Sequence, residues 1–193
     1  MNTADRLKRD KRALRAQIRE LRDRLSPPER DRLSRAIARE LFALPEMERA
    51  DVVMAFSSFG SEVDTGPILE RLSARGRRLA LPRVRDGDIE GLAFAPGQEL
   101  RQARFGALEP VDGAPVAPEE VDLVVTPGVA FDRRGFRVGY GGGFYDRFFR
   151  RTRSDVVKAA VCFGLQVVER VPHGAQDLPV DLLVTEDGVI LCR

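Results

Sequence analysis

The order of apolar and polar positions predicts two amphipathic helices at the start of the chain. Between residues 4 and 25, apolar side chains recur at three- and four-residue steps, which is typical of a helix with one buried face. They are Leu7, Leu14, Ile18, Leu21 and Leu25. A second helix is expected after Ser26, because serine caps a helix start, proline suits the first turn and Glu29 completes a capping box.

Short apolar runs farther along the chain predict strands that are buried on both faces. The clearest runs are 52–56 and 121–125, and further strands are expected at 78–82, 89–94, 158–163, 181–185 and 189–192. Helices are expected from Pro67 to Gly76 and over 144–149. This alternation favours an α/β fold of three α/β/α layers around a mostly parallel sheet. We expect a single domain over 1–193, with N-terminal helices at about 4–44 packed on it.

Composition narrows the classes of function. With 32 Lys+Arg against 30 Asp+Glu, the net charge of +2 does not require a polyanionic partner. Cys162 and Cys192 are far apart and His173 is the only histidine, which excludes a disulfide framework, a cysteine zinc pattern and a multi-histidine metal site. The polar first ten residues and the lack of an apolar run of ~18 residues predict a cytoplasmic protein without a membrane span. A monomer is our default expectation.

Lys11 interrupts the apolar stripe of the first helix, and Arg15 lies one turn after it. A lysine on such a stripe either extends its ammonium to water or faces an anion. Because charged stems often cover apolar surface, the pattern alone favours the first interpretation.

Five glycines lie between Gly135 and Gly143, after a buried strand and before a helix-like aromatic run. Ligands of open α/β sheets bind at the carboxyl ends of strands, so a site is expected here. Glycines let backbone N–H groups approach an anion, a helix start adds unpaired donors, and Arg137 adds a positive fork. A phosphate site and a flexible turn with a basic neighbour both fit this pattern. Neither a P-loop nor the six-residue Rossmann fingerprint is present.

The same stretch resembles a family signature. Phe131-Asp132-x-x-Gly135-x-Arg137-x-Gly139-x-Gly141-x-Gly143-Phe144-Tyr145-Asp146 is similar to the motif of the 5-formyltetrahydrofolate cyclo-ligase family. Three weaker matches agree in order and spacing: Lys11-Arg12-x-x-Arg15, Ser57-x-x-x-x-Glu62-x-Asp64-Thr65 and Leu81-Pro82-Arg83. The resemblance extends from about Lys11 to Glu186.

The resemblance implies a sugar-phosphate isomerase/CoA-transferase type of fold and an activity. The family converts 5-formyltetrahydrofolate, with or without a polyglutamate tail, to 5,10-methenyltetrahydrofolate, using ATP and Mg²⁺. The implied nucleotide contacts are Lys11, Arg15, Arg83, Arg137, Val138, Gly139, Tyr140, Gly141, Gly142, Gly143, Phe144 and Tyr145. The implied folate contacts are Ser57, Glu62, Tyr140, Gly141, Gly142, Gly143 and Phe144. Arg137 and Tyr145 are the implied catalytic residues, and Asp146 and Asp181 the implied Mg²⁺ ligands.

The sequence departs from the family pattern at two places, and two other functions are also compatible with it. Phe144 stands where the family usually has Tyr, and the stretch 105–110 has no Trp where the family often shows one. One alternative is a sugar-phosphate isomerase or an acyl-CoA transferase, in which Glu62 would be the catalytic glutamate. Another is an RNA-binding module that uses the arginines from Arg6 to Arg24. Acidic residues are interleaved with those arginines, which favours a solvated helix face and no nucleic-acid partner.

Overall fold

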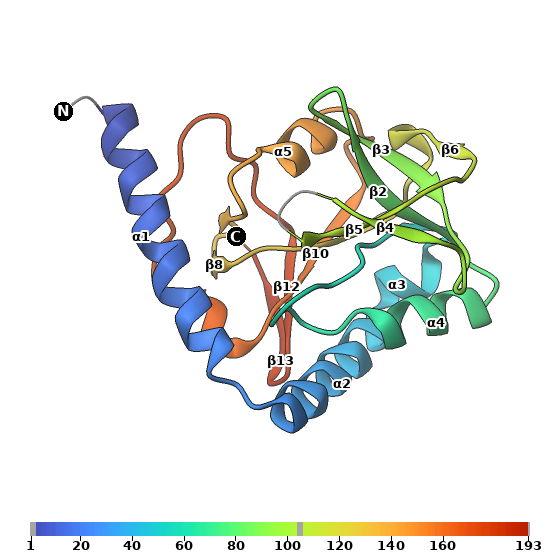
Figure 1. The fold of residues 1–193 in the computed structure, drawn as a ribbon, viewed down its shortest axis with the longest axis horizontal. Coiled ribbons are helices and arrows are strands. Elements are labelled where there is room, and N and C mark those ends of the chain that lie inside the picture. The colour runs from blue at the N-terminus through green and yellow to red at the C-terminus, as the bar shows by residue number, and fades with distance from the viewer. Residues whose placement is uncertain (1–2, 104–105, 193) are drawn as a thin grey trace.

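A central sheet organises the computed structural model, which describes residues 3–103 and 106–192. Within these residues the sheet has eight strands in the order β13-β12-β10-β7-β1-β2-β3-β6 (Figure 1). Its middle strands are parallel: β12 (Leu182–Thr185), β10 (Val157–Val161), β7 (Leu123–Thr126), β1 (Val52–Met54) and β2 (Arg78–Arg85). The outer strands are antiparallel to their neighbours: β13 (Gly188–Leu191), β3 (Asp88–Ala93) and β6 (Pro115–Val116). The expected mostly parallel α/β sheet is confirmed.

The strand expected at 78–82 is longer than predicted. It continues to Arg85 because β2 and β3 form an antiparallel hairpin, in which Arg85 pairs with Asp88. The two turn residues, Asp86 and Gly87, have positive φ angles of 51° and 85°. A two-residue turn with both φ angles positive matches the twist of a hairpin. The two strands can therefore stay paired up to the turn, so β2 extends past Pro82.

Helices cover both faces of the sheet. On one face lie α2 (Pro27–Ala43), α3 (Pro45–Arg49) and α4 (Gly66–Ala74), and α5 (Phe144–Phe149) lies on the other (Figure 1). Successive strand side chains point to opposite faces, so Val53 joins the core under α2 and α4 while Met54 joins the core under α5. The Ser26 hydroxyl accepts a hydrogen bond from the backbone of Glu29, which confirms the expected start of the second helix.

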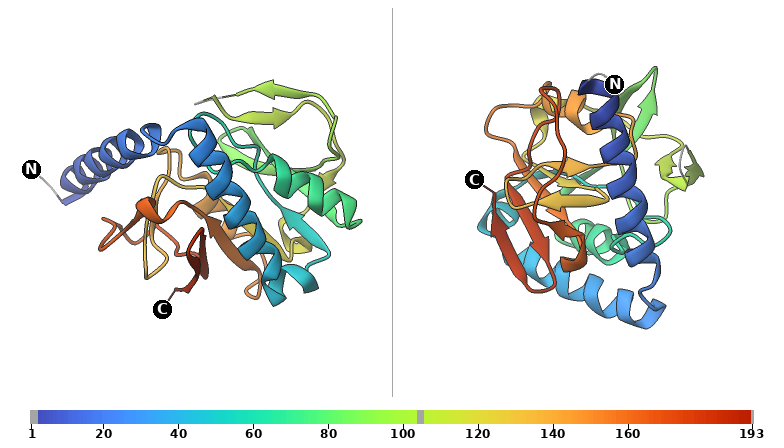
Figure 2. Two further views of the ribbon diagram at one scale, coloured as in Figure 1. Left: turned by 90° about the horizontal axis from the view of Figure 1, so that it is seen from below. Right: turned by 90° about the vertical axis from the view of Figure 1, so that its left-hand side faces the viewer.

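The first helix, α1 (Thr3–Asp23), runs along one side of the molecule, outside these layers (Figure 2). It packs on a small sheet of β11 (Val167–Val168), β8 (Ala130–Asp132) and β9 (Arg137–Val138), and on the short helix η3 (Gly164–Gln166). Ile18 is buried in that contact with Val138 and Val171, and Leu14 packs against the same cluster. Strands of two or three residues are too short to show a periodic pattern, which is why this small sheet was not predicted.

The chain order of the parallel strands creates a crevice in the sheet. From β1, the sheet grows through β2 on one side and through β7, β10 and β12 on the other. The carboxyl ends of β1 and β7 therefore flank the place where the strand order reverses, which is where open α/β sheets bind ligands. The remaining elements are β4 (Leu100–Gln102), β5 (Leu108–Pro110) and η2 (Pro118–Glu120). None of the helices in the described ranges has the length and apolarity needed to cross a membrane.

Candidate active site

A cavity of about 540 Å³ opens at the carboxyl ends of β1 and β7. Phe56 and Ser57 follow β1 and line it, and Pro127 and Gly128 follow β7 and line it as well. The N-terminal helix α1 supplies another wall through Leu7, Lys11 and Arg15, and the glycine loop before α5 supplies a third. The cavity thus joins three segments that are distant in sequence.

The glycine loop takes backbone conformations that other residues adopt with difficulty. Gly141 and Gly143 have φ angles of 107° and 63°, in the left-handed region that favours glycine. Gly143 immediately precedes the first residue of α5. Every residue from Arg137 to Asp146 lines the cavity, so the loop forms a continuous part of its wall.

Arg137 is the most deeply buried cation of the site, with 7% of its surface exposed. Its guanidinium donates to the carbonyl oxygen of Leu178 at 2.7 Å and to Oδ1 of Asp146 at 3.0 Å. It also lies over the ring of Phe149, 5.0 Å from the ring centroid. Burial lowers the pKa of Arg137 from its usual value and Asp146 opposes that shift. Because a guanidinium stays protonated in proteins, Arg137 gives the cavity a fixed positive charge.

α1 adds two more cations to the same part of the cavity. The Lys11 ammonium lies 2.6 Å from both carboxylate oxygens of Asp177, and the side chains are only 21% and 19% exposed. The interpretation that Lys11 extends to water is therefore wrong. Arg15 donates from Nε to the carbonyl oxygen of Gly139 at 2.7 Å. Burial, and then the nearby Arg19 and Arg12, lower the pKa of Arg15, so an anion placed here would relieve positive charge.

Glu62 lies at another part of the cavity wall, with aromatic neighbours. Its Oε1 accepts a hydrogen bond from the Tyr140 hydroxyl at 2.8 Å, and its Oε2 accepts one from the backbone N–H of Phe59 at 3.1 Å. The rings of Phe59 and Tyr140 are 5.2 Å apart. Burial raises the pKa of Glu62, and burial together with Glu62 raises the pKa of Tyr140 to about 12. Both carboxylate oxygens being engaged argues against Glu62 as a transferase nucleophile.

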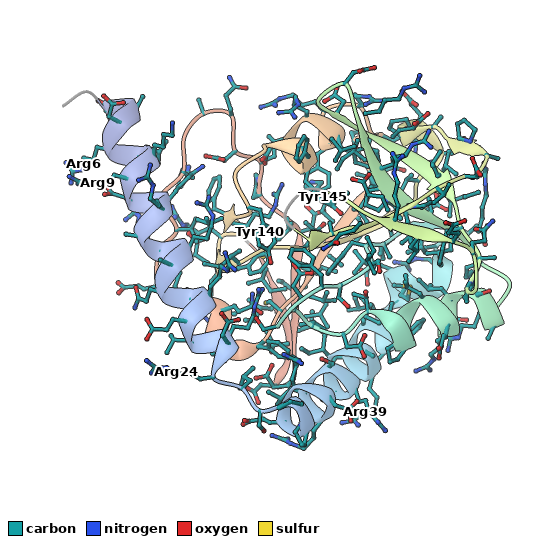
Figure 3. All side chains as sticks on the ribbon, viewed as in Figure 1. Arg6, Arg9, Arg24, Arg39, Tyr140 and Tyr145 are labelled. Carbon is teal, nitrogen blue, oxygen red and sulfur yellow. The ribbon has the colours of Figure 1, made fainter. Side chains whose placement is uncertain are left out.

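The Tyr145 hydroxyl is buried and has no hydrogen-bond partner among the described residues. Tyr140 and Tyr145 both lie in the interior, between α1 and the β2–β3 hairpin (Figure 3). Burial raises the pKa of Tyr145, so the hydroxyl keeps its proton, and the residue lines the cavity.

Comparison with known proteins shows the family of this chain. The model of the 5-formyltetrahydrofolate cyclo-ligase family matches residues 7–186. The chain belongs to this family. The 5-formyltetrahydrofolate cyclo-ligase of Escherichia coli is 33% identical over 178 residues, which cover 89% of this chain and 98% of the relative. This enzyme of the cyclo-ligase family therefore spans almost the whole length of its bacterial relative.

Solved structures support the fold of this cyclo-ligase family member. The solution structure of Aquifex aeolicus 5,10-methenyltetrahydrofolate synthetase superposes with a TM-score of 0.83 at 38% identity, covering 95% of this chain and 93% of that one. A 5,10-methenyltetrahydrofolate synthetase from Mycoplasma pneumoniae superposes with a TM-score of 0.76 at 23% identity, covering 92% and 99% of the two chains, and shows the same fold.

Of the site residues expected from the family resemblance, all but two line the cavity. The first exception is Arg83. Its neighbours Pro82 and Val84 line the cavity, and alternate side chains of a strand point to opposite faces. Arg83 instead donates to Glu90, its partner across the hairpin, at 2.7 Å and to the carbonyl of Val111 at 3.2 Å. The structure therefore does not bring Arg83 to the expected phosphate position.

The second exception is Asp181. It precedes the first residue of β12, so it lies at the amino end of the sheet, whereas the cavity lies at the carboxyl ends. Its carboxylate accepts from the backbone N–H of Lys158 at 2.8 Å and pairs with the Lys158 ammonium at 3.2 Å. The structure separates Asp181 from Asp146, the other carboxylate that the resemblance implied for Mg²⁺.

A different carboxylate, that of Asp177, lies beside Asp146. It lines the cavity with Asp146, and the backbone N–H of the next residue, Leu178, donates to Asp146 at 3.0 Å. No regular pattern marks Asp177 in the sequence; its only signal was its place in the same loop as Asp181. The described residues hold no group of three or more potential metal-ligating side chains. A Mg²⁺ ion held by two carboxylates needs further oxygens from water and phosphate, which is its usual manner of binding.

Proposed function

We propose that this protein closes the ring of 5-formyltetrahydrofolate to give 5,10-methenyltetrahydrofolate, with ATP as co-substrate and Mg²⁺ as metal. The observation that carries this proposal is a single cavity lined both by Lys11, Arg15 and Arg137 and by Glu62 with Tyr140. Clustered cations and a glycine loop suit a triphosphate. A carboxylate beside aromatic rings suits the flat, N–H-bearing ring of a pterin.

The proposed chemistry needs no protein nucleophile. The formyl oxygen on N5 attacks the γ-phosphorus of ATP, the bond from that phosphorus to the bridging oxygen breaks, and ADP leaves with the electron pair. The product is an N5-iminium phosphate. N10 then attacks the same carbon, the carbon–oxygen bond breaks as phosphate leaves, and N10 loses its proton. Phosphoryl transfer of this kind depends on positioning and on stabilisation of charge.

The residues of the cavity provide both requirements. Arg137 and Lys11 line the cavity and would neutralise the phosphate oxygens, and the backbone of 139–143 would follow the triphosphate. Tyr145 lines the same cavity and its buried hydroxyl has no partner among the described residues, so it is our candidate donor to an oxygen at the reacting centre. Asp146 and Asp177 are the carboxylates that would hold Mg²⁺, and a bound Mg²⁺ would neutralise charge on the transferred phosphoryl group.

The direct test is an absorbance assay with purified protein, 5-formyltetrahydrofolate, ATP and Mg²⁺. We expect the methenyl product to form in proportion to the ATP consumed, because the phosphoryl group must activate the formyl oxygen before the ring can close. ADP and phosphate should appear together with the product. Product formation in the absence of ATP, or no product with every component present, would contradict the proposed function.

The assignment of Asp177 in place of Asp181 can be tested with two asparagine variants. We expect Asp177→Asn to raise the Mg²⁺ concentration needed for half-maximal activity by about tenfold or more, because one charged oxygen ligand is lost. Asp181→Asn removes a carboxylate that pairs with Lys158 outside the cavity, so its Mg²⁺ requirement should stay close to that of the unaltered protein. The opposite ranking in a Mg²⁺ titration would restore Asp181 as the ligand.

A further inference from the structure

Arg22, in the last turn of α1, is a buried cation that the proposed mechanism does not use. Only 3% of its surface is exposed. A buried guanidinium is unfavourable unless its donors are paired, so its contacts have to be accounted for. Nε donates to the Ser61 hydroxyl at 3.0 Å, and Nη2 donates to the Tyr140 hydroxyl at 3.1 Å. The Ser61 hydroxyl in turn donates to the carboxylate of Asp23, which supplies a countercharge.

These contacts fix the direction of a chain of hydrogen bonds. A guanidinium can only donate, so the Tyr140 hydroxyl accepts from Arg22 and must place its own proton elsewhere. That proton points to Oε1 of Glu62, at 2.8 Å. Oε2 accepts from the backbone N–H of Phe59. Arg22 therefore fixes Oε1 of Glu62 as an acceptor, and with the Phe59 N–H on Oε2 both oxygens accept, which is the arrangement that suits an ionised carboxylate.

The charge state of Glu62 depends on several elements. Burial raises its pKa, and the Tyr140 hydroxyl, the Phe59 N–H and the Arg22 charge oppose that rise. Burial, and then the charge of Glu62, raise the pKa of Tyr145 at the start of α5. A small polar hollow that Glu62 also lines adds the charged residues Arg30, Asp31 and Asp64. The positive charge of Arg22 lowers the pKa of Glu62, so the loss of Arg22 should have a distinct effect.

The sequence places Arg22 on the same face of α1 as Lys11 and Arg15, the two cations proposed to bind the triphosphate. Lys11, Arg15 and Arg22 are separated by four and seven residues, spacings that put side chains on one face of a helix. Lys11 and Arg15 reach the glycine loop and its surroundings, and Arg22 reaches Tyr140. One helix face therefore serves both ends of the cavity.

We propose that Arg22 is a positioning residue for folate recognition, which acts through the Tyr140 hydroxyl to keep Glu62 ionised and oriented as an acceptor for ring N–H donors. The inference rests on the proposed function. It assigns to α1 a part in binding the folate in addition to its part in binding phosphate. Arg22 itself does not touch the substrate in this scheme.

The test compares binding of 5-formyltetrahydrofolate by calorimetry across a pH series in Arg22→Met, Arg22→Lys and Tyr140→Phe. We expect Arg22→Met to weaken binding by about tenfold at neutral pH, since a charge-assisted hydrogen bond supports the acceptor. ATP affinity should change by less than about twofold, because Lys11 and Arg15 are intact. A carboxylate with a raised pKa loses its charge as pH falls through that pKa. In Arg22→Met the loss of folate binding should therefore begin at higher pH.

The other variants separate positioning from simple stability. Arg22→Lys keeps the charge and should restore most of the pH profile. Tyr140→Phe keeps the aromatic ring but removes the intermediary hydroxyl, and should shift the profile in the same direction. The double variant should be no weaker than the weaker single variant, because both interrupt one chain of contacts. Arg24→Met is the matched control, since Arg24 directly follows α1, pairs with the exposed Glu20 and points away from the rest of the molecule (Figure 3).

Several outcomes would overturn this inference. One is a double variant whose loss of folate affinity equals the product of the losses in Arg22→Met and Tyr140→Phe. Another is a pH profile of folate binding that neither variant shifts. A third is an Arg22→Met protein that binds folate as Arg24→Met does. If Arg22→Met does not fold, an unshifted profile in Tyr140→Phe overturns the inference equally. Failure of the unaltered protein to bind 5-formyltetrahydrofolate is a different result, and it overturns the proposed function itself.

Discussion

Replacing Arg137 by alanine is expected to lower kcat by about a hundred- to a thousandfold, the range found when a fixed donor to a developing negative charge is removed. The same change should lower the free energy of unfolding by about 2 to 4 kcal/mol, because it removes the charged partner of the partly buried Asp146 and leaves the Leu178 carbonyl without its donor. Arg137 bonds both Asp146 and the Leu178 carbonyl, so its loss also frees the loop that carries Asp177. Turnover and urea unfolding of the purified variant measure the two effects.

Arg137→Lys separates these two effects. Lysine keeps the positive charge beside Asp146, so most of the stability should remain, but a single ammonium cannot reproduce the two-armed geometry. We expect kcat to stay at least about tenfold below normal. Arg150→Lys is the control: Arg150 also contacts the same loop, through Gln176, but its side chain is outside the cavity. Near-normal turnover by a folded Arg137→Lys protein would mean that the phosphate is held elsewhere.

Replacing Gly135 by alanine should destabilise the protein by roughly 2 to 5 kcal/mol. Gly135 has a φ angle of 84°, which an L-residue adopts only with strain. A Cβ at this position would also come too close to the backbone oxygen of Val180 for the two to coexist. The backbone N–H of Val180 donates to the carbonyl of Gly135 at 2.9 Å, so neither segment can move away without losing that bond.

Gly76→Ala provides the comparison for this prediction. Gly76 also has a positive φ angle, 69°, but a Cβ there would meet nothing within 4 Å. Its loss of stability, about 1 to 2 kcal/mol, measures the backbone strain alone. Urea unfolding of both variants therefore isolates the cost of the contact with Val180. Equal losses in the two variants would show that the segment around Val180 adapts.

The sequence was sufficient to locate the cavity because its main determinants are local. A buried strand, a glycine-rich loop and an aromatic helix follow one another without a break, and the rule for open α/β sheets places a ligand there. Lys11 and Arg15 are far away in the chain, and only the family resemblance linked them to the glycine loop. Their contacts with Asp177 and Gly139 depend on how α1 packs, which no local pattern records.

The errors in the predicted site have one physical origin. Arg83 and Asp181 were carried over by position along the chain, but the direction of a side chain depends on strand register. Neighbouring residues of a strand face opposite sides, so Pro82 and Val84 line the cavity whereas Arg83 lies on the other face of the hairpin. Asp181 lies in the same connection between strands as Asp177. Its hydrogen bonds with Lys158 nevertheless hold it at the other end of the sheet. Arg22 went unnoticed because a buried arginine looks like any other arginine in an arginine-rich helix.

The pairing of Lys11 with Asp177 has a consequence for how a nucleotide enters. The protein already satisfies this ammonium with an internal anion, so it does not carry an uncompensated charge between turnovers. Under the proposed function, an arriving triphosphate would substitute one negative group for another, and the displaced carboxylate would become free for the divalent cation that accompanies the nucleotide. Entry would then be an exchange of partners, with little change in the local charge.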